Sequence, residues 1–109
     1  MTATHLFRGG DNGRTVEVPT GTGFAVALPE SPTTGYRWSD PEYDQSCMTF
    51  DSDDYIPAPG AAIGGAGTRS FTFTSGKACR TTIRTALKRS WEQGAAAEST
   101  FVLTVVIGN

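Results

Sequence analysis

The sequence predicts an all-β domain, an immunoglobulin-like β-sandwich of about seven or eight strands, and three observations support this fold class. Apolar and polar residues alternate at period two in several short runs, as they do in half-buried strands. Turn residues separate these runs at short intervals, which is the pattern of a sandwich. No window of twelve residues has a helical period, and the nearest candidate, residues 93–98, is short and contains Gly94.

Four strands are predicted in the first half of the chain. Residues 15–18 alternate Val with polar neighbours, a turn follows at 20–23, and residues 24–28 carry Phe, Val and Leu at alternate positions. We expect these two runs to form either a hairpin or a strand crossing between two sheets. Shorter strands are expected at 36–38 and 48–50, each from two apolar residues on one face.

Three strands are predicted in the second half. Phe71 and Phe73 alternate with Thr, and the chain turns at 75–77. Residues 83–88 then place Ile, Thr and Leu on one face and Arg, Ala and Lys on the other. The last run, 101–107, is apolar on both faces, so we expect it to be a central strand.

Length and charge limit the class of protein. The 109 residues suffice for one domain over 1–109, in which 1–13 are expected to be frayed or peripheral. The formal net charge of -2 lacks the basic excess of nucleic-acid binding proteins, so we expect no nucleic-acid partner. No apolar run is long enough to span a membrane, and the first residues do not resemble a signal peptide. As it stands, the sequence predicts a cytoplasmic monomer without a membrane partner, and it leaves an exported form open.

Cys47 and Cys79 lie 32 positions apart and form either a disulfide or two buried thiols. The sequence favours two free thiols, because unpaired cysteine is a common small core residue, and it leaves the bridge open. The only histidine, His5, lies near the start of the chain, and the cysteines lack metal-ligand spacing. We therefore predict no enzyme, no cofactor and no metal site.

Acidic and basic residues are segregated along the chain. Six acids and no base occur between Asp40 and Asp54, whereas six bases and no acid occur between Arg69 and Arg89. The simpler interpretation is that the two segments form complementary faces of neighbouring strands. The alternative is a dipolar surface that steers a partner and changes the association rate more than the affinity.

The connection at 29–36 contains backbone constraints that a plain turn does not need. Pro32 fixes its own φ, and Gly35 permits a positive φ, so Thr33 and Thr34 lie between two restrained positions. This composition indicates a stiff wedge, although Pro-Thr-Thr-Gly is also an ordinary turn sequence.

Two further connections have unusual compositions. Residues 57–68 are mostly Gly, Ala and Pro, so a partner would meet their backbone; the alternative is a flexible connector. Residues 88–97 carry Arg89 and Trp91, residue types that dominate binding hot spots, although Trp91 could instead fold back on the sandwich. In a sandwich of this kind, three such connections can lie at one end.

In this order and spacing, the motifs of the three connections resemble the signature loops of the chagasin family of cysteine-peptidase inhibitors, over about residues 14–107. The matching residues are Pro32, Thr33, Thr34, Gly35 and Tyr36, then Gly64, Gly65, Ala66 and Gly67, then Arg89, Ser90 and Trp91. Three positions depart from the family pattern: Ser31 stands for the usual Asn, Ala66 for a Gly, and Ser90 for a Pro.

The resemblance implies a reversible inhibitor that occludes the active-site cleft of a papain-like (clan CA) cysteine peptidase. It implies that Thr33 and Thr34 lie beside the catalytic thiolate, that the glycines of the second loop contact one wall of the cleft, and that Arg89 and Trp91 contact the other. The alternative is a non-inhibitory immunoglobulin-like binding or adhesion module that uses the same loop end.

Overall fold

The computed structural model describes residues 5–31, 35–57, 67–89 and 99–108. Within these ranges the chain forms eight strands and one short 3-10 helix: β1 His5–Arg8, η1 Gly9–Asp11, β2 Thr15–Pro19, β3 Gly23–Glu30, β4 Tyr36–Trp38, β5 Met48–Pro57, β6 Gly67–Ser75, β7 Cys79–Arg89 and β8 Ser99–Gly108. In these ranges no helix has the length and apolar character that a membrane span needs.

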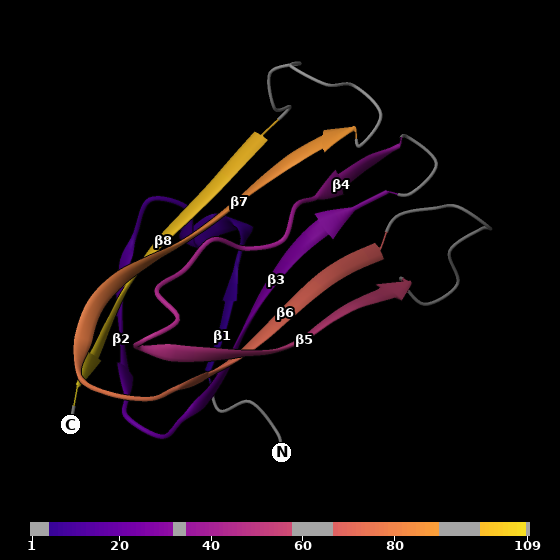
Figure 1. Cartoon of the computed structure of the whole chain (residues 1–109). Helices are drawn as coiled ribbons and strands as arrows, with labels where there is room; N and C mark the ends of the chain where they lie inside the picture. The colour runs from indigo at the N-terminus through magenta and orange to yellow at the C-terminus, as the bar shows by residue number, and fades with distance from the viewer. Residues whose placement is uncertain (1–4, 32–34, 58–66, 90–98, 109) are drawn as a thin grey trace.

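The strands form two four-stranded sheets that lie face to face (Figure 1). Sheet A has the order β1-β3-β6-β5, and sheet B has the order β2-β8-β7-β4. The predicted β-sandwich is therefore confirmed. β2 and β3 belong to different sheets, so the chain crosses between sheets here and does not form a hairpin. β8 lies between β2 and β7, which confirms the central position predicted from its two apolar faces.

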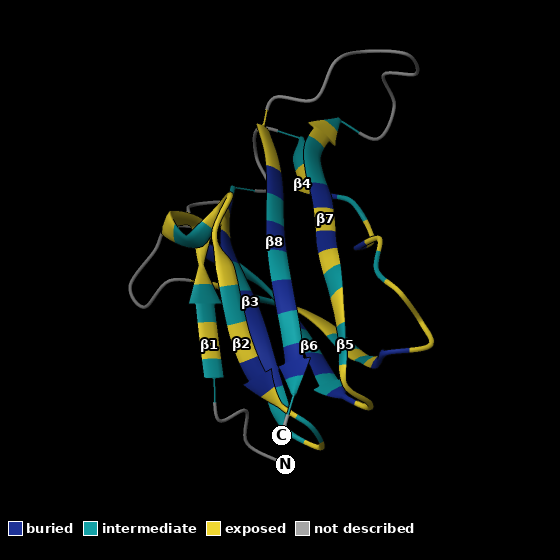
Figure 2. Ribbon diagram, turned by 90° about the vertical axis from the view of Figure 1, so that its left-hand side faces the viewer, coloured by how far each residue is buried: buried dark blue, intermediate teal, exposed yellow. Residues whose placement is uncertain are grey.

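The core forms from alternate residues of the long strands, and Figure 2 shows this alternation as bands along β7 and β8. Phe24, Phe71 and Phe73 of sheet A are fully buried, as are Ile83 and Leu103 of sheet B. Period-two alternation works because successive side chains of a strand point to opposite sides of the sheet. The core fixes the distance between the sheets and therefore the geometry of their ends.

The first residues form an edge of sheet A. β1 pairs in parallel with β3, and the Phe7 ring packs edge-on against Phe24 at a centroid distance of 6.1 Å. Residues 5–11 thus form β1 and η1 at the edge of the sandwich, where Phe7 supplies an apolar contact to the core.

Cys47 and Cys79 form a disulfide, so the prediction of two free thiols is wrong. Cys47 directly precedes β5 of sheet A and Cys79 begins β7 of sheet B, with their Cα atoms 6.3 Å apart. The turn between β6 and β7 holds them close, because the backbone N–H groups of Gly76 and Lys77 donate to the Cys47 carbonyl oxygen. The bridge thus links the two sheets at the end where β5 and β7 begin.

The acid-rich and base-rich segments lie mostly on different sheets. Asp51, Asp53 and Asp54 belong to β5 of sheet A, whereas the bases from Arg80 to Arg89 belong to β7 of sheet B. Complementary pairing occurs at two places, where Glu42 lies opposite Arg84 of β7 and Asp53 binds Arg69 of the neighbouring strand β6. It does not join β5 to β7, because these strands belong to different sheets.

Candidate functional site

The three unusual connections leave from one end of the sandwich, which we call the loop end. β3, β5 and β7 finish there and β4, β6 and β8 begin there (Figure 1). In sheet A, Gly67 is the register partner of both Glu30 and Pro57. In sheet B, Tyr36 is the register partner of Arg89. The strand ends that carry the three connections therefore lie at one end of the sandwich, and the predicted joint surface of the loops stays a prediction.

Four of the predicted peptidase-binding residues lie within the described ranges: Gly35, Tyr36, Gly67 and Arg89. The other eight lie outside the described residues: Pro32, Thr33, Thr34, Gly64, Gly65, Ala66, Ser90 and Trp91. The structure therefore defines the strand ends that carry the three loops.

Tyr36 and Arg89 join the first and third loops. The Arg89 Cζ atom lies 4.6 Å from the centroid of the Tyr36 ring, which is a cation–π contact. Gly35, directly before Tyr36, has φ +80°, as its sequence position predicts, and an L side chain rarely adopts this conformation. In the free protein, Arg89 is thus oriented by its own chain at the root of the third loop.

Gly67 is a close-packing position at the root of the second loop. It is buried, and a Cβ atom added there would overlap the Tyr55 hydroxyl and lie 2.8 Å from the Ile56 carbonyl oxygen. The absence of a side chain at Gly67 lets Tyr55 of β5 lie across the start of β6.

A charged network joins the first and second loops. Arg69 Nε donates to Glu30 Oε2 at 2.7 Å, and Arg69 Nη1 donates to Asp53 Oδ1, also at 2.7 Å. The Glu30 side chain is only 1% exposed and that of Arg69 is 11% exposed. Arg69 Cζ also lies 5.6 Å from the centroid of the Tyr55 ring. The last residue of β3 is therefore held to the first residues of β6.

Glu30 and Asp53 stabilise the charged form of Arg69. Burial opposes the charge of Arg69, but the hydrogen bonds to Glu30 and Asp53 outweigh it and raise the pKa of Arg69. Glu30 Oε1 is buried and has no hydrogen-bond partner among the described residues, and Arg37 Nε lies 3.9 Å from it. Loss of Arg69 would leave this carboxylate with one distant cation.

Neither Glu30 nor Arg69 appeared among the residues predicted from the sequence, although a signal was present. Both continue an inward-facing alternation: Glu30 follows Leu28 by two positions, and Arg69 precedes Phe71 by two. A charged residue at the end of such a series is a candidate for a buried ion pair.

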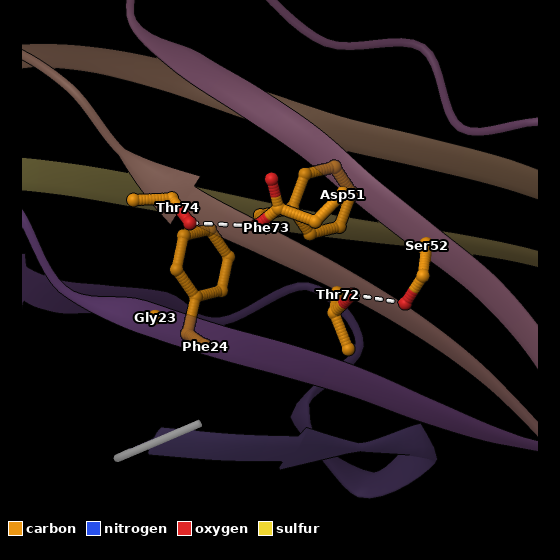
Figure 3. A pocket seen from close by; sticks show the side chains of 7 residues that line it. All are labelled: Gly23, Phe24, Asp51, Ser52, Thr72, Phe73 and Thr74. Carbon is orange, nitrogen blue, oxygen red and sulfur yellow. Dashed lines mark hydrogen bonds between the residues drawn. The ribbon is translucent and has the colours of Figure 1, made fainter. Parts of the chain in front are cut away.

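A pocket in the described part of the chain lies away from the loop end. It has a volume of about 420 Å³ and is lined by Gly23, Phe24, Asp51, Ser52, Thr72, Phe73 and Thr74 (Figure 3). Its polar groups bond to one another, since Thr74 donates to Asp51 at 2.6 Å and the Ser52 and Thr72 hydroxyls form a second pair. We assign no function to this pocket.

Comparison with known proteins identifies the family. Residues 17–105 match the model of the chagasin family of peptidase inhibitors, I42. The chain belongs to the chagasin family. The resemblance inferred from the three motifs is therefore confirmed. Membership favours an inhibitor of cysteine peptidases over a non-inhibitory binding module.

Solved structures support the same conclusion for the fold. The cysteine protease inhibitor EhICP2 from Entamoeba histolytica has a TM-score of 0.84 and 25% identity, with 94% of each chain covered. Amebosin has a TM-score of 0.74 and 24% identity, covering 94% of this chain and 96% of its own. PbICP-C, solved in complex with falcipain-2, has a TM-score of 0.67 and 13% identity, covering 96% and 91%. No curated protein matches this chagasin-family chain.

Proposed function

We propose that this chagasin-family protein is a reversible inhibitor of papain-like cysteine peptidases and that it occludes the active-site cleft with the loops at 29–36, 57–68 and 88–97. The observation that carries the proposal is the clustering of the three loop roots at one end of a rigid sandwich. A relative of the same fold has been solved bound to falcipain-2, which agrees with this class of target.

In this mechanism the inhibitor blocks the cleft sterically and takes part in no chemical step. Thr33 and Thr34 occupy the cleft beside the catalytic thiolate, and Pro32 and Gly35 keep the wedge narrow. Because the wedge is restrained before binding, it loses little conformational entropy. It also need not present a peptide carbonyl in attack geometry, so the inhibitor resists cleavage.

The flanking loops contact the two walls of the cleft. Gly64, Gly65 and Ala66 present backbone to one wall, with the buried Gly67 at the root of their loop, and Arg89, Ser90 and Trp91 contact the other. The contacts of Glu30 with Arg69 and of Tyr36 with Arg89 set the spacing of these loops before the peptidase arrives. Preorganisation of this kind slows dissociation more than it changes association.

We further propose that the protein acts in an oxidising compartment. The disulfide between Cys47 and Cys79 supports this, because such bonds persist where thiols are not kept reduced. Thiol labelling of the protein in cells of its source tests the proposal. Labelling of both cysteines without prior reduction would contradict it.

Active-site titration of a papain-like peptidase tests the proposed function. We expect stoichiometric inhibition, with the inhibitor intact on electrophoresis afterwards. Trp91→Ala should raise the inhibition constant by about thirtyfold, about 2 kcal/mol, if Trp91 is a hot spot. Leu6→Ala is the control, since Leu6 is an exposed apolar side chain of β1, away from the loop end. No inhibition by the folded wild-type protein at stoichiometric concentration would contradict the function.

A further inference from the structure

The charges along β7 differ between its two ends. The residues directly opposite one another on adjacent strands share a face of the sheet. On the β8 side, Arg80 lies opposite Val106 and Arg84 opposite Val102. On the β4 side, Arg84 lies opposite Glu42 and Lys88 opposite Arg37. On that side a cation therefore faces an acid in the middle of β7 and a second cation at the loop end.

Two like charges opposite each other weaken a sheet, and Arg37 and Lys88 form such a pair. Both are exposed, and the Arg37 side chain is 61% exposed. Arg37 Nε lies 3.9 Å from Glu30 Oε1, but Arg69 already binds the other oxygen of that carboxylate. The positive charge of the pair is therefore incompletely balanced.

The pair borders a surface groove. Arg37, Trp38, Ser39, Asp40 and Lys88 line a groove of about 230 Å³ beside β4. Its two cations and one carboxylate give the groove a net positive charge. Arg37 directly follows Tyr36 and Lys88 directly precedes Arg89, so the groove adjoins the roots of the first and third loops.

We propose that the Arg37–Lys88 groove receives acidic side chains from the rim of the target peptidase's cleft and selects peptidases with an acidic rim. This inference rests on the proposed function, because the peptidase must approach the loop end. Its basis is the net positive charge that Arg37 and Lys88, opposite each other on β4 and β7, give to the groove beside the loop end. Steering of this kind raises the association rate and is reduced by salt.

The main experiment compares Lys88→Glu with Arg80→Glu, measuring association rates by stopped-flow fluorescence in about 0.1 M salt. Both variants lower the net charge equally, and both sites are exposed on the same strand. Arg80 lies about 26 Å along β7 from Lys88, at about 3.3 Å per residue. That distance exceeds the Debye length of about 10 Å, so only Lys88→Glu should affect the loop end.

Two papain-like peptidases serve as probes, one with an acidic and one with a basic cleft rim. With the acidic enzyme, we expect association to slow about fivefold in Lys88→Glu and to change little in Arg80→Glu. With the basic enzyme, Lys88→Glu should speed association. The difference should disappear in about 1 M salt, where the Debye length is about 3 Å.

Thermal unfolding separates this role from a structural one. Lys88→Glu replaces a like-charge pair by an opposite-charge pair, so its melting temperature should equal or exceed that of the wild type while its association slows. Arg37→Gln, compared with Arg80→Gln, repeats the test at the second residue of the pair.

Three results would overturn the inference: equal changes in Lys88→Glu and Arg80→Glu, equal slowing with both peptidases, or no salt dependence. Inhibition of both enzymes by every variant at wild-type rates would reject the groove and leave the proposed function intact. No inhibition by the wild type would reject both.

Discussion

Arg69 of β6 donates to the buried carboxylate of Glu30 at the end of β3, with 2.7 Å between Nε and Oε2. The contact joins the end of β3 to the start of β6, the strand ends that carry the first and second loops. Each residue occupies the position where an inward-facing apolar series reaches the edge of the core. The ion pair therefore closes the sandwich where the proposed inhibitory loops begin.

Replacing Arg69 should destabilise the fold, because Glu30 would stay buried without its principal partner. We expect Arg69→Met to lower the free energy of unfolding by about 3 kcal/mol, measured by urea denaturation. The double variant Glu30→Met, Arg69→Met should lose less than Arg69→Met alone, because no unpaired charge remains. If the double variant lost as much free energy of unfolding as the two single variants together, the side chains would not be coupled.

The contact between Arg89 and Tyr36 should matter more for inhibition than for folding. Tyr36→Leu removes the ring that orients Arg89, a contact worth about 1 kcal/mol, so we expect the inhibition constant to rise about fivefold. Tyr36→Phe keeps the ring and should inhibit nearly as well as the wild type. Equal inhibition by Tyr36→Leu and the wild type would remove this pair from the mechanism.

A methyl group at Gly67 should be costly. Gly67→Ala would force Tyr55 and the backbone at Ile56 apart, and overpacking of this kind costs about 1 to 3 kcal/mol. Gly108→Ala is the matched control, since nothing lies within 4 Å of a Cβ atom there and the residue also belongs to a strand. Thermal unfolding of the two variants compares them directly, and similar melting temperatures would contradict the packing role.

Loss of the disulfide should reduce stability and leave inhibition unchanged. The bridge joins residues 32 apart, so the chain-entropy model gives about 3 to 4 kcal/mol. We expect reduction by dithiothreitol, or the double variant Cys47→Ala, Cys79→Ala, to lower the free energy of unfolding by this amount, measured by urea denaturation. The inhibition constant should be that of the wild type wherever the protein is folded, because the bridge lies at the end opposite the loops. A weaker inhibitor under those conditions would show that the two ends are coupled.

Much of the fold could be predicted from short stretches of sequence. Residues 24–28 and 101–107 each identify their own buried face, because side chains of a strand alternate with period two whatever lies beside it. The two apolar faces of residues 101–107 also indicated a central strand, which β8 is. The three loop motifs indicated the family, because their residue types and order need no knowledge of contacts.

Other features depended on which strands became neighbours. Cys47 and Cys79 meet because β5 and β7 begin at the same end of two stacked sheets. Glu30 meets Arg69 through the register of β3 on β6, and Arg37 lies opposite Lys88 through that of β4 on β7. Periodicity is local, whereas pairing and stacking join residues tens of positions apart. The sequence by itself therefore determined the strands, their buried faces and the loop motifs, while the disulfide, the ion pair and the like-charge pair were decided only by the tertiary structure.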